Sequence, residues 1–175
     1  MDHYLEIKLR PDPEFVPTML MNALYGKLHR ALVQLDNCRL GVSFPDMDQA
    51  RPTLGECLRL HSNADNLQQL MAIDWLSGMR DHSTVRELIP IPENISYRVV
   101  RRVQSKSNPE RLRRRLAKRK GISMEEARQL IPDSAAKHLT LPFVCIRSQS
   151  TGENFRLFIE HMPLQITQTQ GEFSY

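Results

Sequence analysis

The residues between 101 and 120 include ten basic side chains and one acid. The whole chain holds 24 Lys and Arg against 20 Asp and Glu, so the rest of it carries 14 basic and 19 acidic residues and is net acidic. A basic block on an otherwise acidic chain is typical of a surface that binds a polyanion. The first chemistry that the sequence suggests is therefore phosphate binding, with nucleic acid as the first candidate ligand.

Most of this block is predicted to form one helix. Asn108 can cap it, Pro109 suits its first position, and Gly121 ends it after about three turns. Leu112 and Leu116 lie one turn apart and are expected to anchor the helix to the protein. A solvated charged face is the alternative, but such faces usually carry interleaved acids, and only one acid is available here. The cations expected to face outward are Arg111, Arg114, Arg115, Lys118 and Arg119.

Arg102 and Gln104 are two residues apart on a segment expected to be extended, so both project to the same side. Arg can pair with the acceptor edge of guanine and Gln with adenine, each pairing being worth about 1–3 kcal/mol of discrimination. The alternative is that both are ordinary exposed strand residues.

His29 is the candidate general base, because histidine titrates near neutral pH and can remove a proton there. A histidine beside the apolar stripe of a helix is more often structural or merely exposed. Gly26, however, lies one turn earlier on the same row, and a glycine inside a helix costs roughly 1 kcal/mol relative to alanine. The missing side chain could admit a nucleotide to the imidazole.

The segment RSQSTG offers hydroxyls and backbone amides at the end of an expected strand. Ser148 and Ser150 share one side, and Thr151 and Gly152 begin the turn. Such groups can hold a ribose and a phosphate, or can simply shape a hairpin turn.

The elements that must position these residues follow from periodicity and turn signals. The order βαββαβ is typical of a ferredoxin-like arrangement. Its members are a strand over 4–9, a helix from 18 to about 35, strands over 39–44 and 56–61, a helix from about 64, and a strand within 85–91.

Beyond Asn94 the sequence becomes more basic and β-branched, which predicts a domain boundary there. The second domain would hold a strand, the Arg-rich helix, a short helix with the capping box Ser123 and Glu126, and a hairpin of FVCIRS with FRLFIEH. The prediction is an α+β fold with a ferredoxin-like domain over 1–94 and a smaller domain over 95–175.

The sequence contains no cysteine pair or His/Cys cluster with metal-ligand spacing, so no metal or cofactor is expected. Asp46 and Asp48 fit a plain turn. The apolar runs are too short for a secretory signal or a membrane span, and we expect a cytoplasmic protein.

Three separated blocks, RRVQSKSNPERLRRRL, RSQSTGENFRLFI and MDHYLEIKLRPDPEF, resemble the CRISPR-repeat endoribonuclease of subtype I-F over essentially the whole chain. The resemblance implies metal-independent cleavage at the base of the repeat RNA hairpin, with the Arg-rich helix docked along the hairpin. It also implies that the product stays bound within the type I-F CRISPR surveillance complex, whose other subunits are expected partners.

The resemblance also implies individual roles. His29 matches the catalytic histidine, Ser148 would hold the reacting ribose, and Tyr175 is the candidate for a tyrosine that orients the histidine. Phe155 would stack on the terminal base pair; its alternative is core packing with Leu157 and Ile159. The residues expected to bind RNA are Arg102, Gln104, Ser107, Arg111, Arg114, Arg115, Lys118, Arg119, Lys120, Ser150, Thr151 and Phe155.

Two other functions compete with this hypothesis. One is a hairpin-RNA-binding or assembly protein in which His29 has no catalytic role. The more distant one is a DNA-binding regulator, although the chain lacks helix-turn-helix spacing.

Overall fold

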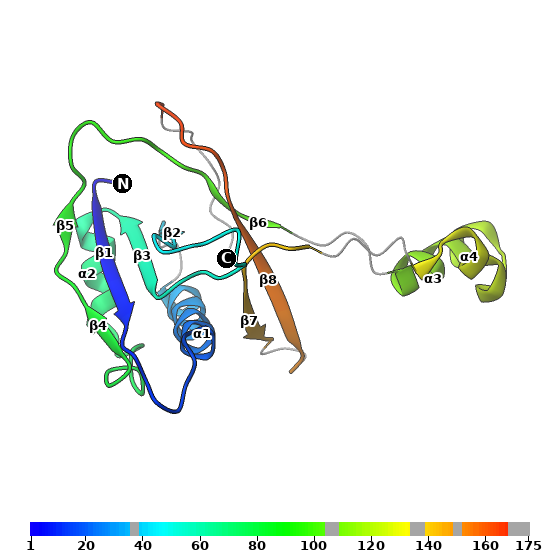
Figure 1. The fold of residues 1–175 in the computed structure, drawn as a ribbon, viewed down its shortest axis with the longest axis horizontal. Helices are drawn as coiled ribbons and strands as arrows, with labels where there is room; N and C mark the ends of the chain where they lie inside the picture. Colours follow the sequence, from blue (N-terminus) through cyan, green and yellow to red (C-terminus); the bar gives the residue numbers. More distant parts are fainter. Residues whose placement is uncertain (36–38, 104–108, 134–138, 149–151, 168–175) are drawn as a thin grey trace. The chain divides into compact units, whose positions relative to one another are not determined.

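The computed structural model describes residues 1–35, 39–103, 109–133, 139–148 and 152–167 (Figure 1). Its contacts divide the chain into two units. One unit comprises Met1–Arg102 with Leu141–Tyr175, and the other is Val103–Thr140. The division at residue 94 expected from the sequence concerns folding domains and remains a prediction.

The first unit contains the expected βαββαβ order. Its antiparallel sheet has the order β2-β3-β1-β4, and β5 also pairs with β1. The predicted α+β fold is confirmed. The elements are β1 (His3–Leu9), α1 (Pro17–Leu35), β2 (Gly41–Ser43), β3 (Cys57–Ser62), α2 (Ala64–Ala72), β4 (Ser83–Val85) and β5 (Ile89–Pro90).

The last strand of this sheet differs from the sequence-based expectation of one strand within 85–91. Two short strands take its place: β4 pairs with the end of β1 and β5 with its beginning. Pro90 has no N–H to donate, so it can pair only on an outer strand, where its nitrogen needs no partner. The edge of the sheet is therefore short and interrupted.

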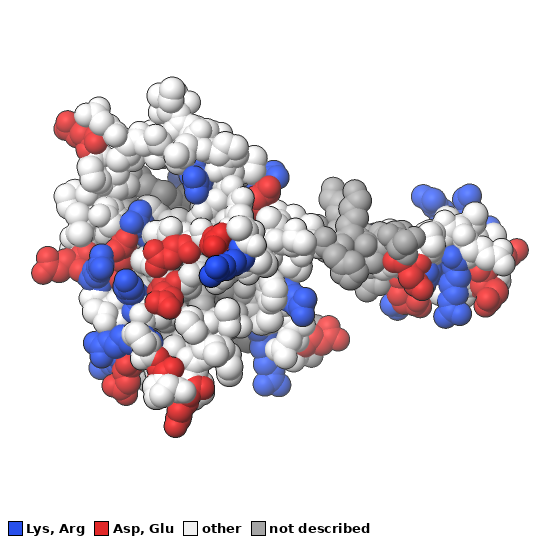
Figure 2. Space-filling model, viewed as in Figure 1, with Lys and Arg blue, Asp and Glu red and all other residues white. Residues whose placement is uncertain are grey.

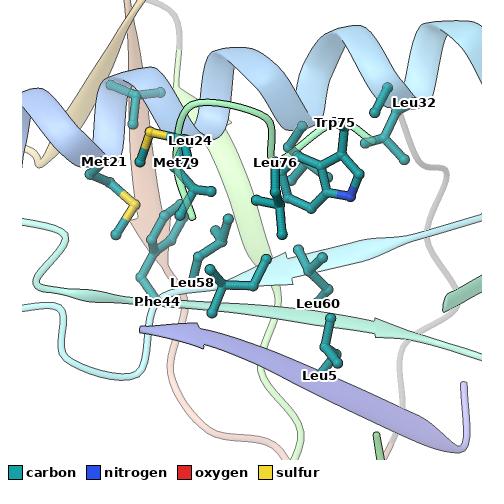
Figure 3. Close-up of a cluster of buried hydrophobic side chains, with 14 of the residues drawn as sticks. Leu5, Met21, Leu24, Leu32, Phe44, Leu58, Leu60, Trp75, Leu76 and Met79 are labelled. Carbon is teal, nitrogen blue, oxygen red and sulfur yellow. The ribbon is translucent and has the colours of Figure 1, made fainter. Parts of the chain in front are cut away.

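The core of this unit lies between the sheet and the apolar face of α1 (Figure 3). In β1 the alternation of Leu5, Ile7 and Leu9 buries one face. In α1 the buried residues recur every three or four positions, which places them on one stripe. They are Leu20, Met21, Leu24, Leu28, Ala31 and Leu32.

A second, three-stranded sheet adds to the same core. It consists of β6 (Val100–Val103), β7 (Phe143–Arg147) and β8 (Asn154–His161), in the order β6-β8-β7. The predicted hairpin is confirmed, because β7 and β8 pair antiparallel with Ile146 opposite Phe155. Val144 and Ile146 alternate on the buried face of β7 and belong to the cluster that contains the α1 stripe.

The second unit pairs α3 (Pro109–Lys120) with α4 (Met124–Leu130). Gly121 adopts φ 67°, a conformation that glycine accepts readily, and its N–H donates to the carbonyl of Ala117 at 2.8 Å. The predicted capping box is confirmed: Ser123 Oγ accepts from the N–H of Glu126, and the Glu126 carboxylate accepts from the N–H of Ser123.

One cation of α3 points inward. Arg113 is 6% exposed, whereas Leu112 and Leu116, the expected anchors, are half-buried. Arg113 Nε donates to the carbonyl of Ile131 at 2.8 Å, and Nη2 contacts Asp133 Oδ1 at 2.7 Å. Arg113 therefore fastens α3 to the segment after α4. This one cation of the helix does not belong to its outward face.

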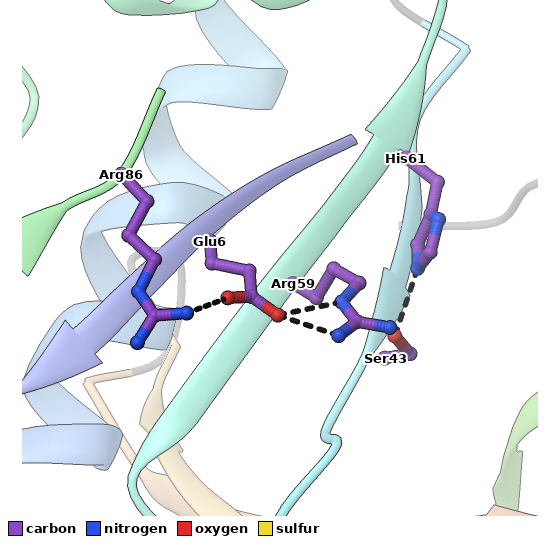
Figure 4. A network of polar contacts seen from close by, with 5 residues as sticks. All are labelled: Glu6, Ser43, Arg59, His61 and Arg86. Carbon is purple, nitrogen blue, oxygen red and sulfur yellow. Dashed lines mark hydrogen bonds and ion pairs between the residues drawn. The ribbon is translucent and has the colours of Figure 1, made fainter. Parts of the chain in front are cut away.

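A polar network covers the face of the first sheet opposite the α1 core (Figure 4). Glu6 Oε1 accepts from Arg59 Nε at 2.9 Å, and Glu6 Oε2 accepts from Arg86 Nη1 at 2.9 Å. Burial opposes ionisation of Glu6, but the two guanidiniums outweigh it and lower the pKa of the carboxyl. Burial, with a smaller contribution from Arg59, lowers the pKa of His61 to about 4, and His61 Nε2 lies 2.8 Å from Ser43 Oγ.

We expect Glu6→Gln to lower the free energy of unfolding at pH 7 by about 1–2 kcal/mol, an amount limited by the solvent exposure of both arginines. The carboxylate stabilises the fold fully above its ordinary pKa near 4.5 and loses this effect as the pH falls through the lowered pKa. Urea titrations of both proteins at pH 7 and at pH 3 would therefore converge at the lower pH. Glu14→Gln, at an exposed carboxylate, is the control and should change little; a pH-independent difference for Glu6→Gln would contradict this account.

Candidate functional site

The outward face of α3 is a ridge of cations. Two nearby acids contact the inward-pointing Arg113: Glu110 at 3.9 Å and Asp133 at 2.7 Å. Figure 2 shows Lys and Arg on the surface of the α3–α4 unit with acidic side chains beside them. In the described ranges, no ion pair engages the exposed residues Arg114, Arg115, Lys118, Arg119 and Lys120; Arg111 is also exposed. The first five of these side chains, Arg114, Arg115, Lys118, Arg119 and Lys120, can neutralise phosphates without first breaking a salt bridge to a described residue.

Arg101 and Arg102 are neighbours in β6 but have different surroundings. Arg101 pairs with Glu160 of β8 at 2.8 Å. Arg102 is exposed and makes no ion pair within the residues that the structure covers. Its guanidinium is thus available for a ligand, whereas that of Arg101 holds two strands together. Gln104 and Ser107 lie outside the described residues.

His29 lies in α1, half-buried at the border of the apolar stripe. Among the described residues, a Cβ built at Gly26, one turn before His29, would meet only Arg30 Nη1, at 3.8 Å. That this position admits a nucleotide to the imidazole remains a prediction.

Ser148 follows β7 at the start of the hairpin turn. Its N–H donates to the carbonyl of Glu153 at 2.8 Å, and its own carbonyl accepts from the N–H of Gly152 at 2.9 Å. Gly152 adopts φ 70°, which favours glycine, and its carbonyl accepts from Arg147 Nε at 3.2 Å. These bonds fix the backbone of Ser148 at the end of the strand. Ser150 and Thr151 lie outside the described part of the chain.

A hydrogen bond between side chain and backbone ties α1 to β7. Asn22 Oδ1 accepts from the N–H of Cys145 at 2.8 Å, on the outer strand of the second sheet. Phe143, two residues before Cys145 in β7, and Thr18, one turn before Asn22 in α1, line the same pocket. Helix α1 and strand β7 are therefore in contact around the Asn22–Cys145 hydrogen bond.

The rise along the two elements relates His29 to Ser148. Seven residues of helix separate Asn22 from His29, a rise of about 10.5 Å. Three residues of strand separate Cys145 from Ser148, a rise of about 10 Å. His29 and Ser148 thus lie at similar rises, along their own elements, from the hydrogen bond that joins α1 to β7.

Phe155 is 37% exposed, although its neighbour of the same parity, Ile159, is 3% exposed. The alternative of core packing predicted burial for both. Phe155 is therefore free to offer a ring surface to a ligand, near the same end of the hairpin as Ser148. Tyr175 lies outside the described residues.

Sequence reasoning missed two residues of this region. Arg113 precedes Leu116 and Ala117 by three and four positions, so helical periodicity could have placed it on the inner face. Asn22 gave no comparable signal, because its partner Cys145 is 123 residues away.

The described residues hold no group of three or more His, Cys, Asp or Glu side chains arranged to bind a metal ion. None of their helices has both the length and the apolar character that crossing a membrane requires.

The sequence was compared with known proteins. Residues 4–175 match the model of the family described as CRISPR-associated protein (Cas_Csy4). A CRISPR-associated endonuclease Cas6/Csy4 of Pseudomonas aeruginosa (strain UCBPP-PA14) is 59% identical over 174 residues, which are 99% of this chain and 93% of the relative. A protein of the same name from Escherichia coli (strain UTI89 / UPEC) is 45% identical over 174 residues, with the same shares of both chains. The chain belongs to the Cas_Csy4 family of CRISPR-associated proteins.

Proposed function

We propose that this protein is an endoribonuclease that cuts CRISPR precursor RNA at the base of the repeat hairpin, without a metal ion. The curated relatives are named CRISPR-associated endonucleases. Among the residues matched to the family motifs, His29 offers a general base and Ser148 a hydroxyl that can hold a ribose. The observation that supports the proposal is the Asn22–Cys145 hydrogen bond, which ties α1, the helix of His29, to β7, the strand that leads to Ser148.

The RNA provides its own nucleophile in this mechanism. His29 removes the proton from the 2′-hydroxyl just upstream of the scissile phosphate, while Ser148 holds that ribose. The 2′ oxygen then bonds to phosphorus, and the bond from phosphorus to the 5′ oxygen breaks. The products are a 2′,3′-cyclic phosphate and, once the departing oxygen takes up a proton, a 5′-hydroxyl.

Binding depends on other residues. The α3 ridge neutralises phosphates along the stem, and an A-form major groove is too deep and narrow for these side chains to read bases inside it. Base reading at the foot of the stem falls to Arg102 and Gln104, and Phe155 stacks on the terminal pair. Because these contacts survive the cut, the hairpin product stays bound, and the protein acts in the cytoplasm as a subunit of the type I-F surveillance complex.

A hairpin-binding protein without catalytic activity would share all the binding residues. The pairing of Gly26 with His29 one turn later favours the enzyme, because binding alone gives no reason for a glycine, which costs helix stability, at that position.

For the catalytic step, His29→Ala is expected to lower the single-turnover rate in EDTA by about 10²–10⁴-fold with little change in hairpin affinity, since the imidazole acts chiefly in the transition state. A single 2′-deoxy substitution upstream of the scissile phosphate should abolish cutting by the wild type. His3→Ala, at a histidine outside the site, is the control. Cleavage of the deoxy substrate would refute the mechanism even if hairpin binding were intact.

For the ridge, the expected signature is salt dependence. Replacing Arg115, Lys118 and Arg119 together by alanine should reduce the slope of log affinity against log salt by about two to three units, at about 0.7–0.9 per phosphate contact. Arg128→Ala removes one cation from α4 of the same unit and should leave the slope nearly unchanged. An equal slope in the triple variant and the wild type would show that α3 does not bind the backbone.

For the link between α1 and β7, a double-mutant cycle separates positioning from stability. Asn22→Leu leaves the N–H of Cys145 unpaired and should lower the cleavage rate about tenfold or more, because small misplacements of catalytic groups are costly. If Asn22 acts by positioning Ser148, it should have little further effect in a Ser148→Ala background. Gln69→Leu, at an exposed amide of α2, is the control; multiplicative effects of Asn22→Leu and Ser148→Ala would indicate a merely structural role.

A further inference from the structure

A second cationic site lies on α1, on the other border of the helix from His29. Lys27, Arg30 and Gln34 recur at helical spacing and line a pocket of about 450 Å³, a volume within the range of ligand sites. The segment from Ile73 to Trp75 forms the opposite wall.

Helical geometry connects this pocket with His29. At about 100° per residue, Gly26 lies about 60° around α1 from His29, Arg30 about 100° and Lys27 about 160°, all in the same sense. The path from His29 to the pocket therefore crosses the exposed face of the helix at Gly26 and Arg30. Of the described residues, only Arg30 comes near a Cβ built at Gly26, through Nη1 at 3.8 Å, so its guanidinium lies over the glycine.

The charge of the pocket suits an anion. Arg30 is exposed and makes no ion pair with any described residue. Lys27 Nζ donates to the carbonyl of Ser77 at 2.6 Å and has two further donors. Asp74, the acid of the lining, is paired with Arg80 at 2.7 Å, so its charge is compensated.

Trp75 adds an unused donor. The residue is 8% exposed, and its Nε1–H has no hydrogen-bond partner in the described part of the chain. Figure 3 shows the indole beside α1 with its nitrogen on the edge of the ring away from Leu76. Buried donors are nearly always paired, so this indole N–H is a group that the described part of the fold leaves unsatisfied in a residue that lines the pocket.

We propose that Arg30 and Lys27, with the Trp75 pocket, bind the phosphate backbone of single-stranded RNA on the 3′ side of the cleavage site. This inference rests on the proposed function. Ser148 is expected on the β7 border of α1 and would hold the ribose upstream of the scissile phosphate, so the continuing strand must leave across the other border. Gly26 lets the RNA backbone approach the helix closely there.

The test uses binding rather than cleavage, so that it is independent of catalysis. A synthetic CRISPR-repeat hairpin with a 2′-deoxyribose upstream of the scissile phosphate is made in three forms: ending at that phosphate, extended by unpaired nucleotides on the 3′ side, and extended equally on the 5′ side. Affinities are measured by fluorescence anisotropy over a salt series. For the wild type, the 3′ extension should tighten binding and steepen the salt slope by about 0.7 for each phosphate held.

Arg30→Ala combined with Lys27→Gln should remove both effects of the 3′ extension and leave the affinity for the unextended hairpin unchanged. Arg51→Ala, at an exposed cation elsewhere in the same unit, should retain both effects. Three results would overturn the proposal. They are tighter binding of the 3′-extended hairpin by the double variant, an equal tightening of wild-type binding by the 5′ extension, or no change in the affinity of the wild type on 3′ extension. In the last case the pocket would serve another anion, such as an acidic protein segment. A failure of the His29 mechanism would instead appear as cleavage by His29→Ala, with the extension effect intact.

Discussion

Burial of the apolar stripe of α1 is the interaction on which the first unit depends. Leu24 and Leu28 are completely or almost completely buried, and they share one cluster with Ile7 of the first sheet and Val144 of the second. Burying one such side chain is worth about 1.5–3 kcal/mol, so the helix cannot rotate or slide without losing contacts to both sheets. The residues on its borders, His29 among them, are consequently held in fixed directions.

This arrangement separates affinity from chemistry. The cations of α3 are carried by a two-helix unit that is stabilised by its own capping box and by the buried Arg113. The candidate catalytic residues depend instead on the α1 core and on the Asn22–Cys145 hydrogen bond. In the proposed mechanism, a variant of the ridge and a variant of α1 are therefore expected to disturb different properties, and the hairpin would stay bound after its phosphodiester is cut.

Local signals in the sequence predicted much of this structure. Asn63 caps α2 at the expected start, Gly121 ends α3, and the box at Ser123 begins α4, because each acts within a few residues of its own position. The split between β4 and β5 and the inward turn of Arg113 depend on pairing with more distant segments. The Asn22–Cys145 bond and the pocket at Trp75 join residues far apart in the chain and could not be predicted from spacing. The catalytic and RNA-binding roles remain predictions. They rest on residues of suitable chemistry at the positions that match the motifs of the family.

The central claim is that the RNA supplies the nucleophile and this chain supplies the base that activates it. End-group analysis of the cleaved hairpin by mass spectrometry, after a single turnover in EDTA, tests that claim most directly. The account predicts a 2′,3′-cyclic phosphate on the hairpin fragment and a 5′-hydroxyl on the other fragment. A 3′-hydroxyl paired with a 5′-phosphate, or no cleavage until Mg²⁺ is added, would contradict it.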